Sequence, residues 1–270
     1  MTNHSHKIGF IGGGKMATVF IAGVLAKKIC PPQHIVVHTK TSTSQQRLHH
    51  DFQILATRTN SDVVDTSDTI ILAVKPIDLT SVLTEISDRI TDKHLIISLA
   101  TGASIAKIKE TIGKDVPVVR VMSNTAARIG MAAQAVSFAP ICTNAQKQWV
   151  LRLCEAVGTV AEVPESQANA VMALAGSGPA FVFWLMEAFI KAGTRAGLAE
   201  KLATDLTLQT FSGASLLAQK RYATLPELIH EVSSPGGITI EGLKHLNSSD
   251  CADILSETVA AAIQRAQELE

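Results

Sequence analysis

A glycine-rich turn close to the start of the chain restricts the fold more than any other sequence feature. The turn follows a short apolar run and reads G-G-G-K-M-A at residues 12–17. Gly12, Gly14 and Ala17 fill the small positions of the pattern G-x-G-x-x-G/A, which permit a tight turn, approach of the backbone to a pyrophosphate, and packing of a helix on a strand. A run with helical spacing follows at Lys15–Lys28. This context predicts a dinucleotide-binding unit, and the alternative is a purely structural glycine turn.

Strand-like and helix-like segments alternate from the N-terminus to about Pro164. The β-branched runs that predict strands are Lys7–Ile11, His34–His38, Thr69–Val74, Leu95–Leu99, Val116–Val121 and Ala133–Phe138. Between several of them lie segments with helical spacing, at Lys15–Lys28, Asp78–Ile90 and Ser104–Ile112. Because strand–helix–strand units make right-handed crossovers, the order predicts an α/β fold with an N-terminal Rossmann-like, doubly wound and mainly parallel sheet.

The remainder of the chain carries no strand signal. Helix-forming residues dominate Ser166–Gly197, Ala199–Lys220 and Asp250–Glu268. Small residues gather at Ala168, Ala170, Ala173, Ala175, Gly176, Gly178 and Ala180. The segment Ser177-Gly178-Pro179 predicts a helix start, with serine as N-cap and proline in the first turn. We expect a Rossmann domain over residues 1–164 and an all-helical dimerisation domain over 165–270, because so much apolar helix surface has no sheet to cover.

Composition and charge argue against several functions. Lys plus Arg and Asp plus Glu both number 24, so no positive excess favours a nucleic-acid partner. The cysteines Cys30, Cys142, Cys154 and Cys251 lack metal-ligand spacing, and we expect reduced thiols and no metal site. The N-terminus lacks a signal-peptide pattern, and no uninterrupted apolar run reaches the ~18 residues that span a bilayer. We expect a soluble, cytoplasmic protein with no membrane partner.

The segment after the second predicted strand indicates which dinucleotide is bound. An NAD-binding domain usually carries an acidic residue there, which holds the ribose hydroxyls. No acidic residue occurs between Gly12 and His50, and the strand ends in His38-Thr39-Lys40-Thr41-Ser42. A lysine cation and hydroxyl groups suit a 2′-phosphate, which a carboxylate would repel. The segment favours NADPH, with NADH as the alternative cofactor and an ordinary basic loop as the alternative interpretation.

Segments along nearly the whole chain resemble the pyrroline-5-carboxylate reductase family, in that family's order. They are Gly9–Ala17 (G-F-I-G-G-G-K-M-A), Ala73–Pro76 (A-V-K-P), Val118–Met122 (V-V-R-V-M), Ala175–Phe181 (A-G-S-G-P-A-F), Gly197–Leu198 (G-L), Gln209–Ala214 (Q-T-F-S-G-A) and Val232–Thr239 (V-S-S-P-G-G-I-T). The S-P-G-G segment after a G-S-G-P helix is the most specific part, because generic dinucleotide folds lack it.

The resemblance implies a reaction, an assembly and a set of site residues. The reaction is hydride transfer from C4 of the nicotinamide of NADPH to the C=N carbon of L-1-pyrroline-5-carboxylate, which gives L-proline in the last step of proline biosynthesis. The assembly is a homodimer with intertwined helical domains and shared active sites, and in some members a decamer, or pentamer of dimers. The implied substrate-binding residues are Val232, Ser233, Ser234, Gly236, Gly237 and Thr239. The glycine turn, the basic loop and the resemblance together predict the cofactor-binding residues Gly12, Gly13, Gly14, Lys15, Met16, Thr39, Lys40, Thr41, Asn60, Ala73, Val74, Lys75, Pro76, Ala100, Asn124, Ser177 and Gly178.

The chemistry of the S-P-G-G segment fits such a substrate. Ser234-Pro235-Gly236-Gly237 is a turn sequence that can expose successive backbone N–H groups, and such a concavity binds a carboxylate. Thr239 offers a hydroxyl that can hydrogen-bond the ring nitrogen, whose protonation eases hydride addition. Lys75 is the nearest ionisable catalytic candidate, and its alternative role before Pro76 is structural. For the whole segment the alternative is a plain loop between helices.

The chain also departs from the family pattern. Ser123 and Ala126 stand where the family usually has the two prolines of M-P-N-T-P, so we expect a less rigid loop there. Phe181 replaces a usual tyrosine, and Ile238 occupies a position that is commonly Thr or Ala. The segment Leu228–Val232 lacks the usual Arg-Asp. We expect these changes to tune substrate choice or to lower activity.

Other functions remain as alternatives. One is reduction of a different cyclic imine, and another is a catalytically weak NADPH-binding homologue with a regulatory role. A β-hydroxyacid dehydrogenase is disfavoured, because its helical K-x-x-x-N pattern is absent at Lys191, Lys201 and Lys220.

Overall fold

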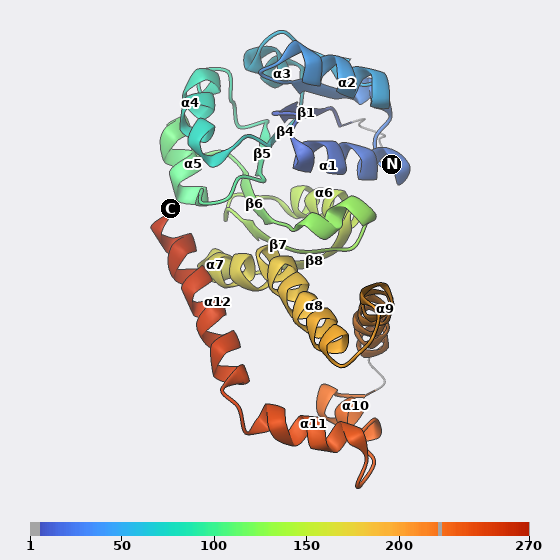
Figure 1. The fold of residues 1–270 in the computed structure, drawn as a ribbon. Helices are drawn as coiled ribbons and strands as arrows, with labels where there is room; N and C mark the ends of the chain where they lie inside the picture. Colours follow the sequence, from blue (N-terminus) through green and yellow to red (C-terminus); the bar gives the residue numbers. More distant parts are fainter. Residues whose placement is uncertain (1–5, 221–222, 270) are drawn as a thin grey trace. The chain divides into compact units, whose positions relative to one another are not determined.

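The computed structural model describes residues 6–220 and 223–269. Within them one sheet has the strand order β3-β2-β1-β4-β5-β6-β7-β8 (Figure 1). The strands are β1 (Ile8–Ile11), β2 (Ile35–His38), β3 (Leu55–Ala56), β4 (Thr69–Leu72), β5 (Leu95–Ser98), β6 (Val118–Met122), β7 (Ala132–Phe138) and β8 (Gly158–Glu162). Neighbouring strands pair in parallel, except that β6 and β7 are antiparallel. The predicted Rossmann-like, mainly parallel sheet is confirmed.

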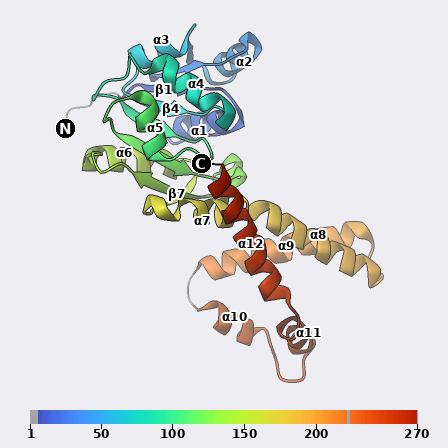
Figure 2. The same ribbon diagram turned by 90° about the vertical axis from the view of Figure 1, so that its left-hand side faces the viewer.

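Helices cover both faces of this sheet (Figure 2). The helices are α1 (Lys15–Ala26), α2 (Ser42–Phe52), α3 (Asn60–Thr66), α4 (Pro76–Ile86), α5 (Ile105–Ile112) and α6 (Asn144–Glu155), with short 3-10 turns η1 (Pro32–His34), η2 (Thr125–Ile129) and η3 (Glu165–Gln167). Helix α1 contacts α2 and α6 in one layer, and α4 contacts α3 and α5 in the other. This is the doubly wound arrangement that right-handed crossovers produce.

The starts of these helices separate into two kinds. Side-chain oxygens of Thr41, Thr59, Ser104 and Thr143 accept hydrogen bonds from the backbone N–H groups three residues ahead and cap α2, α3, α5 and α6. Helix α1 follows Gly14 and helix α4 follows Lys75, and neither has a side-chain cap. Their first N–H groups therefore lack the partner that the other helices carry.

The central strands form the core. All four residues of β1, β4 and β5 are buried, as expected of strands covered on both faces. The carboxyl ends of these parallel strands meet at one edge of the sheet, where loops to the following helices gather the predicted cofactor residues.

Several elements escaped the sequence analysis. Strand β3 has two exposed residues, and β8 is a half-exposed edge strand of sequence GTVAE, so neither shows an apolar run. Helix α2 is mostly polar, and α6 has a polar first half before its apolar residues, so neither shows a clear helical pattern along its length. Both depend instead on their N-caps and on a few buried residues such as Leu48 and Val150.

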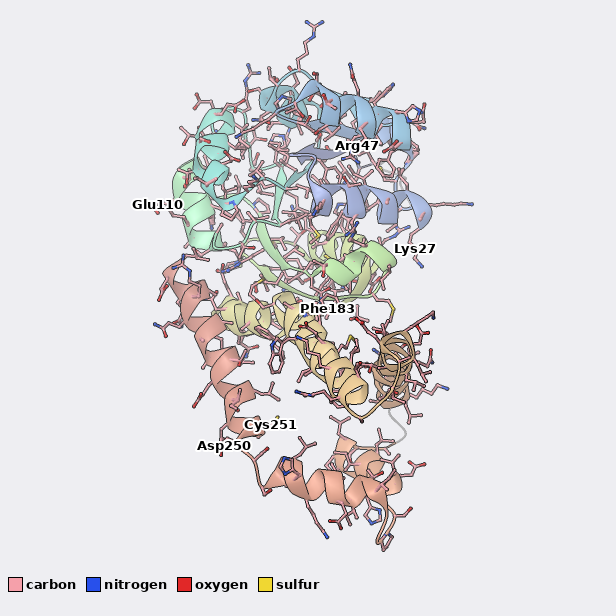
Figure 3. All side chains as sticks on the ribbon, viewed as in Figure 1. Lys27, Arg47, Glu110, Phe183, Asp250 and Cys251 are labelled. Atoms are coloured by element: carbon pink, nitrogen blue, oxygen red, sulfur yellow. The ribbon has the colours of Figure 1, made fainter. Side chains whose placement is uncertain are left out.

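A second compact unit extends over Gly178–Ala261, whereas the first runs to Ser177 and also includes the end of the chain from Ala262. Its described elements are helical, as predicted: α8 (Gly178–Arg195), α9 (Glu200–Gln219), α10 (Leu225–Glu231), α11 (Ile238–Asn247) and the greater part of α12 (Cys251–Glu268). Helices α8 and α9 pack together through an edge-on contact of Phe189 with Phe211, whose ring centroids are 5.3 Å apart. Many large apolar side chains of this unit stay exposed, including Phe183 at 63% (Figure 3).

The predicted helix start is correct in its place, since α8 begins at Gly178 with Pro179 in its first turn, but Ser177 has helical backbone angles (φ −84°, ψ −23°) and not the extended ones of an N-cap. Helix α7 (Ala168–Val171) continues through a π-helical turn, Met172–Gly176, in which the Ser177 N–H donates to the Met172 carbonyl at 2.9 Å. Pro179 has no N–H for the α-helical bond to the Ala175 carbonyl. That carbonyl accepts a hydrogen bond from Asn124 Nδ2 at 2.9 Å instead. A side chain from another loop thus satisfies the group that proline leaves open, and the helix does not have to end there.

The helical stretch Glu165–Arg195 is long and apolar enough to cross a membrane by length and composition alone, because an 18-residue segment within it has a mean hydropathy of 1.5. It is not an uninterrupted apolar run, since it includes Asn169, Ser177 and Glu187. Only 6% of that 18-residue segment is buried within this chain. The stretch therefore has a large apolar surface that needs a partner.

The cysteines are free, and Cys30, Cys142 and Cys154 are buried. Burial raises the pKa of the Cys30 thiol to about 11 and that of Cys154 to about 12. Burial also raises the pKa of Cys142. The expectation that most of the thiols are packed is confirmed, since three of the four are buried.

Thiol labelling tests this packing. At about pH 8, with the native protein, we expect at most one thiol per chain, that of Cys251, to react rapidly with a thiol reagent, because the buried thiols are inaccessible and protonated. All the cysteines should react after denaturation in guanidinium chloride. Rapid reaction of a second thiol in the native protein would contradict the described core.

Candidate cofactor and substrate site

The turn at Gly12 follows β1 and lies between the ends of β2 and β4, the two strands that flank β1. Gly12 has φ +99°, and its N–H donates to the carbonyl of His38, at the end of β2, at 2.9 Å. A Cβ on Gly12 would stand 2.6 Å from the carbonyl oxygen of Ala73, just after β4. A Cβ on Gly13 would collide with Thr39 and Leu48. The fold therefore requires glycine at both positions.

Gly14 differs, because nothing lies within 4 Å of the place where its Cβ would be. It is the N-cap of α1, which has neither a side-chain cap nor an acidic residue in its first turn. Free N–H groups and the positive end of the helix dipole thus face open space. The residues present fit a pyrophosphate at this helix start.

The hydroxyls of Thr39 and Thr41 in the basic loop already form hydrogen bonds within the protein. Thr39 is buried and donates to the Thr41 carbonyl at 2.8 Å, while the Thr41 hydroxyl caps α2 through Ser44. Lys40 is exposed, and its Nζ lies 2.6 Å from Asp78 Oδ1 at the start of α4. The loop offers a cation, as the sequence indicated, but a carboxylate from elsewhere in the chain already pairs with it.

Asn60 has a structural connection at the same edge. Its Oδ1 lies 2.6 Å from His38 Nδ1, and its Nδ2 donates to Glu85 Oε2 at 2.8 Å. The side chain is buried, with 8% of its surface exposed. Its amide therefore links the end of β2 to α4 through α3, and Glu85 is a partner that the sequence analysis missed.

Arg47 is a second cation that the sequence analysis missed. It lies on α2 (Figure 3), and its Nη2 is 3.3 Å from the Thr18 hydroxyl and 3.5 Å from the Gly13 carbonyl. The helical spacing from Thr43 to Arg47 could have placed it on one face, but only the tertiary structure brings that face to α1.

The A-V-K-P segment directly follows β4. Ala73 donates its N–H to the Ile11 carbonyl at 2.9 Å, which fixes the segment beside the Gly12 turn. Lys75 is the N-cap residue of α4, with an exposed side chain, and Pro76 is the first helical residue. The structure thus gives Lys75 the structural position that was the alternative to a catalytic role, and leaves its ammonium group accessible.

A cavity of about 100 Å³ lies beyond the carboxyl ends of β5 and β6 and is lined in part by Met16, Ala100 and Ser123. The Ser123 hydroxyl is buried without a hydrogen-bond partner among the described residues. The usual proline at this position would have no such group, so Ser123 adds a free polar atom to the wall beside the α1 start.

The second missing proline has a clear local consequence. The Ala126 N–H donates to Asn124 Oδ1 at 3.1 Å, which a proline could not do. The Asn124 side chain is 8% exposed, and its Nδ2 donates to the Ala175 carbonyl, so both ends of its amide are bonded within the protein. These bonds hold the loop that we expected to be less rigid, and they give Asn124 a structural role.

The predicted substrate residues lie together in the second unit. Val232 ends α10, and Gly237 is the N-cap of α11, with no side-chain cap. Gly236 has φ +73°, and the Gly237 N–H donates to the Ser234 carbonyl at 2.9 Å, which closes the turn. Thr239 is exposed in the first turn of α11. The backbone N–H groups that begin α11 are therefore open to an anion.

The predicted residues thus form two groups. Gly12–Met16, Thr39–Thr41, Asn60, Ala73–Pro76, Ala100 and Asn124 lie at the carboxyl edge of the sheet or next to it in the first unit, which also contains Ser177. Gly178 and the segment Val232–Thr239 belong to the second unit.

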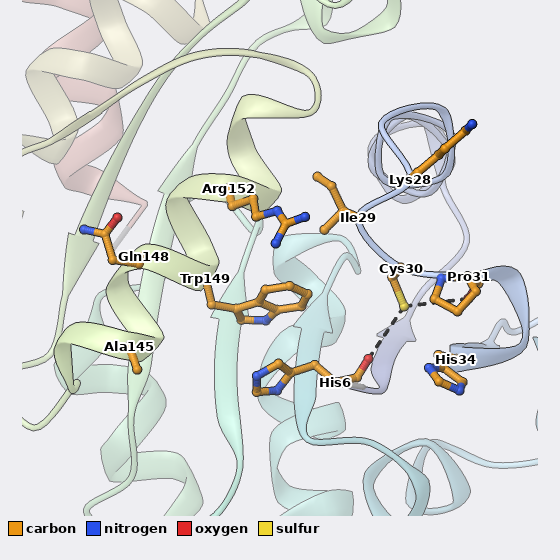
Figure 4. A pocket seen from close by; sticks show the side chains of 10 residues that line it. All are labelled: His6, Lys28, Ile29, Cys30, Pro31, His34, Ala145, Gln148, Trp149 and Arg152. Atoms are coloured by element: carbon orange, nitrogen blue, oxygen red, sulfur yellow. Dashed lines mark hydrogen bonds between the residues drawn. The ribbon is translucent and has the colours of Figure 1, made fainter. Parts of the chain in front are cut away.

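A larger pocket, of about 620 Å³, opens at the opposite, amino edge of the sheet (Figure 4). His6 precedes β1 there and stacks on Trp149 with ring centroids 4.8 Å apart. Cys30, His34 and Arg152 also line it. Because the strands are parallel, this pocket is separated from the Gly12 turn by the length of β1 and is not the predicted site. No group of three His, Cys, Asp or Glu side chains suited to a metal ion occurs within residues 6–220 and 223–269.

The parallel sheet, the Gly12 turn and the uncapped helix behind it define a Rossmann-type dinucleotide-binding protein. Two family models match the chain. The one described as NADP oxidoreductase, coenzyme F420-dependent, matches residues 7–102, and the one described as pyrroline-5-carboxylate reductase dimerisation matches residues 165–269.

Individual relatives match nearly the whole chain. A pyrroline-5-carboxylate reductase of Arabidopsis thaliana is 34% identical over 98% of this chain and 96% of its own. A solved pyrroline-5-carboxylate reductase from Coxiella burnetii is 32% identical, with a TM-score of 0.94 over 99% of both chains. The pyrroline carboxylate reductase of Plasmodium falciparum, solved with NADP bound, is 27% identical, with a TM-score of 0.85 over 98% of both chains. This chain belongs to the pyrroline-5-carboxylate reductase family.

Two glycine substitutions separate the structural from the binding role of the turn. Gly12→Ala should destabilise the protein by about 1–3 kcal/mol, because alanine is strained at this φ and meets the Ala73 carbonyl. Gly14→Ala should leave the free energy of unfolding within about 1 kcal/mol of the wild type and still weaken NADPH binding, since its methyl group enters the space in front of α1. Denaturant unfolding and fluorescence titration measure the two effects. Unchanged NADPH affinity in Gly14→Ala would show that the pyrophosphate does not approach this residue.

Proposed function

We propose that the protein reduces L-1-pyrroline-5-carboxylate to L-proline with NADPH. The observation that carries the proposal is the combination of two open helix starts, one behind Gly14 and one behind Gly237, in a chain of this family. The Plasmodium falciparum relative was solved with NADP bound, which supports the choice of cofactor. NADH is the alternative that the Lys40–Asp78 pair keeps open.

The first unit supplies a cradle for the dinucleotide. Gly14 and the start of α1 would hold the pyrophosphate, while Lys40 and the start of α2 would face the 2′-phosphate. Met16, Ala100 and Ser123 would line the nicotinamide end. The bound cofactor supplies the hydride, and the apolar part of this wall keeps water away from it.

The substrate segment of the second unit holds the carboxylate and the ring nitrogen. The N–H groups at the start of α11 suit the substrate carboxylate. The Thr239 hydroxyl would hydrogen-bond the ring nitrogen and position the C=N bond. Lys75 is the ionisable group proposed to assist protonation, since its ammonium is accessible beside the loop after β4.

We propose further that residues 165–270 form the dimerisation domain, set apart from a Rossmann domain that ends at residue 164. The dimerisation family model covers this region, and its apolar side chains are largely exposed in the single chain. Pairing of two copies would cover the apolar stretch Glu165–Arg195, so we assign this stretch to the dimer interface and not to a membrane. We accordingly propose that the protein is cytoplasmic. A pentamer of dimers is the larger assembly proposed.

A different cyclic imine is the second candidate substrate. Ile238 is 93% exposed at the start of α11 and replaces a smaller residue, so it would alter the space beside the bound ring. A weakly active homologue that binds NADPH for regulation is the third candidate.

A direct spectrophotometric assay tests the proposal. Loss of NADPH absorbance with L-1-pyrroline-5-carboxylate should be rapid and faster than with NADH. Thr239→Val should lower kcat by about 10- to 100-fold with little change in NADPH affinity, because it removes only a hydroxyl donor. Thr239→Ser, which keeps the hydroxyl, is the matched control and should retain most of the activity. Normal NADPH binding without turnover would contradict this substrate and favour the other candidates.

A further inference from the structure

The Lys40–Asp78 ion pair lies across the carboxyl end of β1. Lys40 belongs to the loop after β2, and Asp78 to the first turn of α4, after β4. Strands β2 and β4 are the two neighbours of β1 in the sheet. A contact of 2.6 Å between Lys40 Nζ and Asp78 Oδ1 therefore connects the two sides of the edge where the Gly12–Gly14 turn lies.

The Lys40–Asp78 ion pair can break at a low cost in free energy. The Lys40 side chain is 74% exposed while it forms its ion pair with Asp78. Exposed ion pairs contribute little to stability, because water solvates both charges and the long lysine side chain loses freedom when it is held. Lys40 can exchange one anionic partner for another at low cost.

We propose that Asp78 is a specificity-determining residue, which holds Lys40 in the cofactor-free protein and competes for it with the 2′-phosphate of NADPH. The inference rests on the proposed function, since it takes the dinucleotide to lie over the Gly12–Gly14 turn. On binding NADPH, Lys40 leaves a carboxylate for a more highly charged phosphate. NADH offers only ribose hydroxyls at that place, so Lys40 stays with Asp78.

The competition predicts in which direction removal of the Asp78 charge changes the preference for NADPH over NADH. In Asp78→Asn the rival anion is gone and Lys40 is available to the phosphate from the start. Loss of the Asp78 charge also reduces repulsion of the pyrophosphate, which is common to NADPH and NADH, and of the 2′-phosphate, which only NADPH carries. The part of the change that disappears when Lys40 is absent therefore isolates the route through Lys40.

The test is a double-mutant cycle on dissociation constants, measured by fluorescence titration of each cofactor at fixed ionic strength. The proteins are the wild type, Asp78→Asn, Lys40→Gln and the double variant. Asp78→Asn should raise the preference for NADPH over NADH by about two- to fivefold, the range of an exposed ion pair. In the Lys40→Gln background the same substitution should raise the preference clearly less, because only the direct repulsion between Asp78 and the 2′-phosphate remains.

Asp88→Asn is the matched control, because Asp88 is exposed just beyond the opposite end of α4 and its loss changes the net charge equally. It should leave the preference at the wild-type value. An unchanged preference in Asp78→Asn, or an equal rise without Lys40, would overturn the inference. Failure of the folded wild type to bind NADPH would overturn the proposed function as well, whereas normal binding without turnover would contradict only the substrate.

Discussion

The passage of the backbone through Gly12 is the constraint from which the rest of the site follows. The turn has φ +99°, bonds to the end of β2 through the His38 carbonyl and passes the Ala73 carbonyl too closely for any Cβ. Only glycine can connect β1 to α1 under those conditions. As a result α1 begins directly behind the sheet edge, with its unpaired N–H groups directed at the space in front of Gly14.

The same geometry decides which side chains meet there. Because β2 and β4 flank β1, the loop after β2 and the first turn of the helix after β4 bring Lys40 and Asp78 together although they are far apart in sequence. Asn60 fastens the end of β2 to α4 through His38 and Glu85. Asn124 links the loop after β6 to the helix that leads into the second unit by bonding the carbonyl that Pro179 leaves open. Buried amides thus hold this edge in place while exposed charges remain free to exchange partners.

The sequence predicted the elements with strong local signals. The apolar strands β1, β4 and β5, the glycine turn and the helices after Pro164 all have patterns that depend on near neighbours. The short edge strands and the polar helices lack such patterns, since tertiary contacts and caps stabilise them. The site shows the same division: Gly12 and Gly14 could be predicted from spacing, whereas Asp78, Arg47 and Glu85 reach the site only through the strand order. The helix start at Gly178 was predicted from Pro179, whereas the helical turn directly before it was not, because the bond from Asn124 to the Ala175 carbonyl comes from a residue distant in sequence.

The central claim is that this fold directs a hydride from the nicotinamide to the C=N carbon of L-1-pyrroline-5-carboxylate. The most direct measurement is mass spectrometry of the product formed with NADPH that carries deuterium in both positions at C4. The account predicts L-proline containing a single deuterium, bound to the former C=N carbon. Proline without deuterium, or no proline at all from protein that binds NADPH, would contradict it.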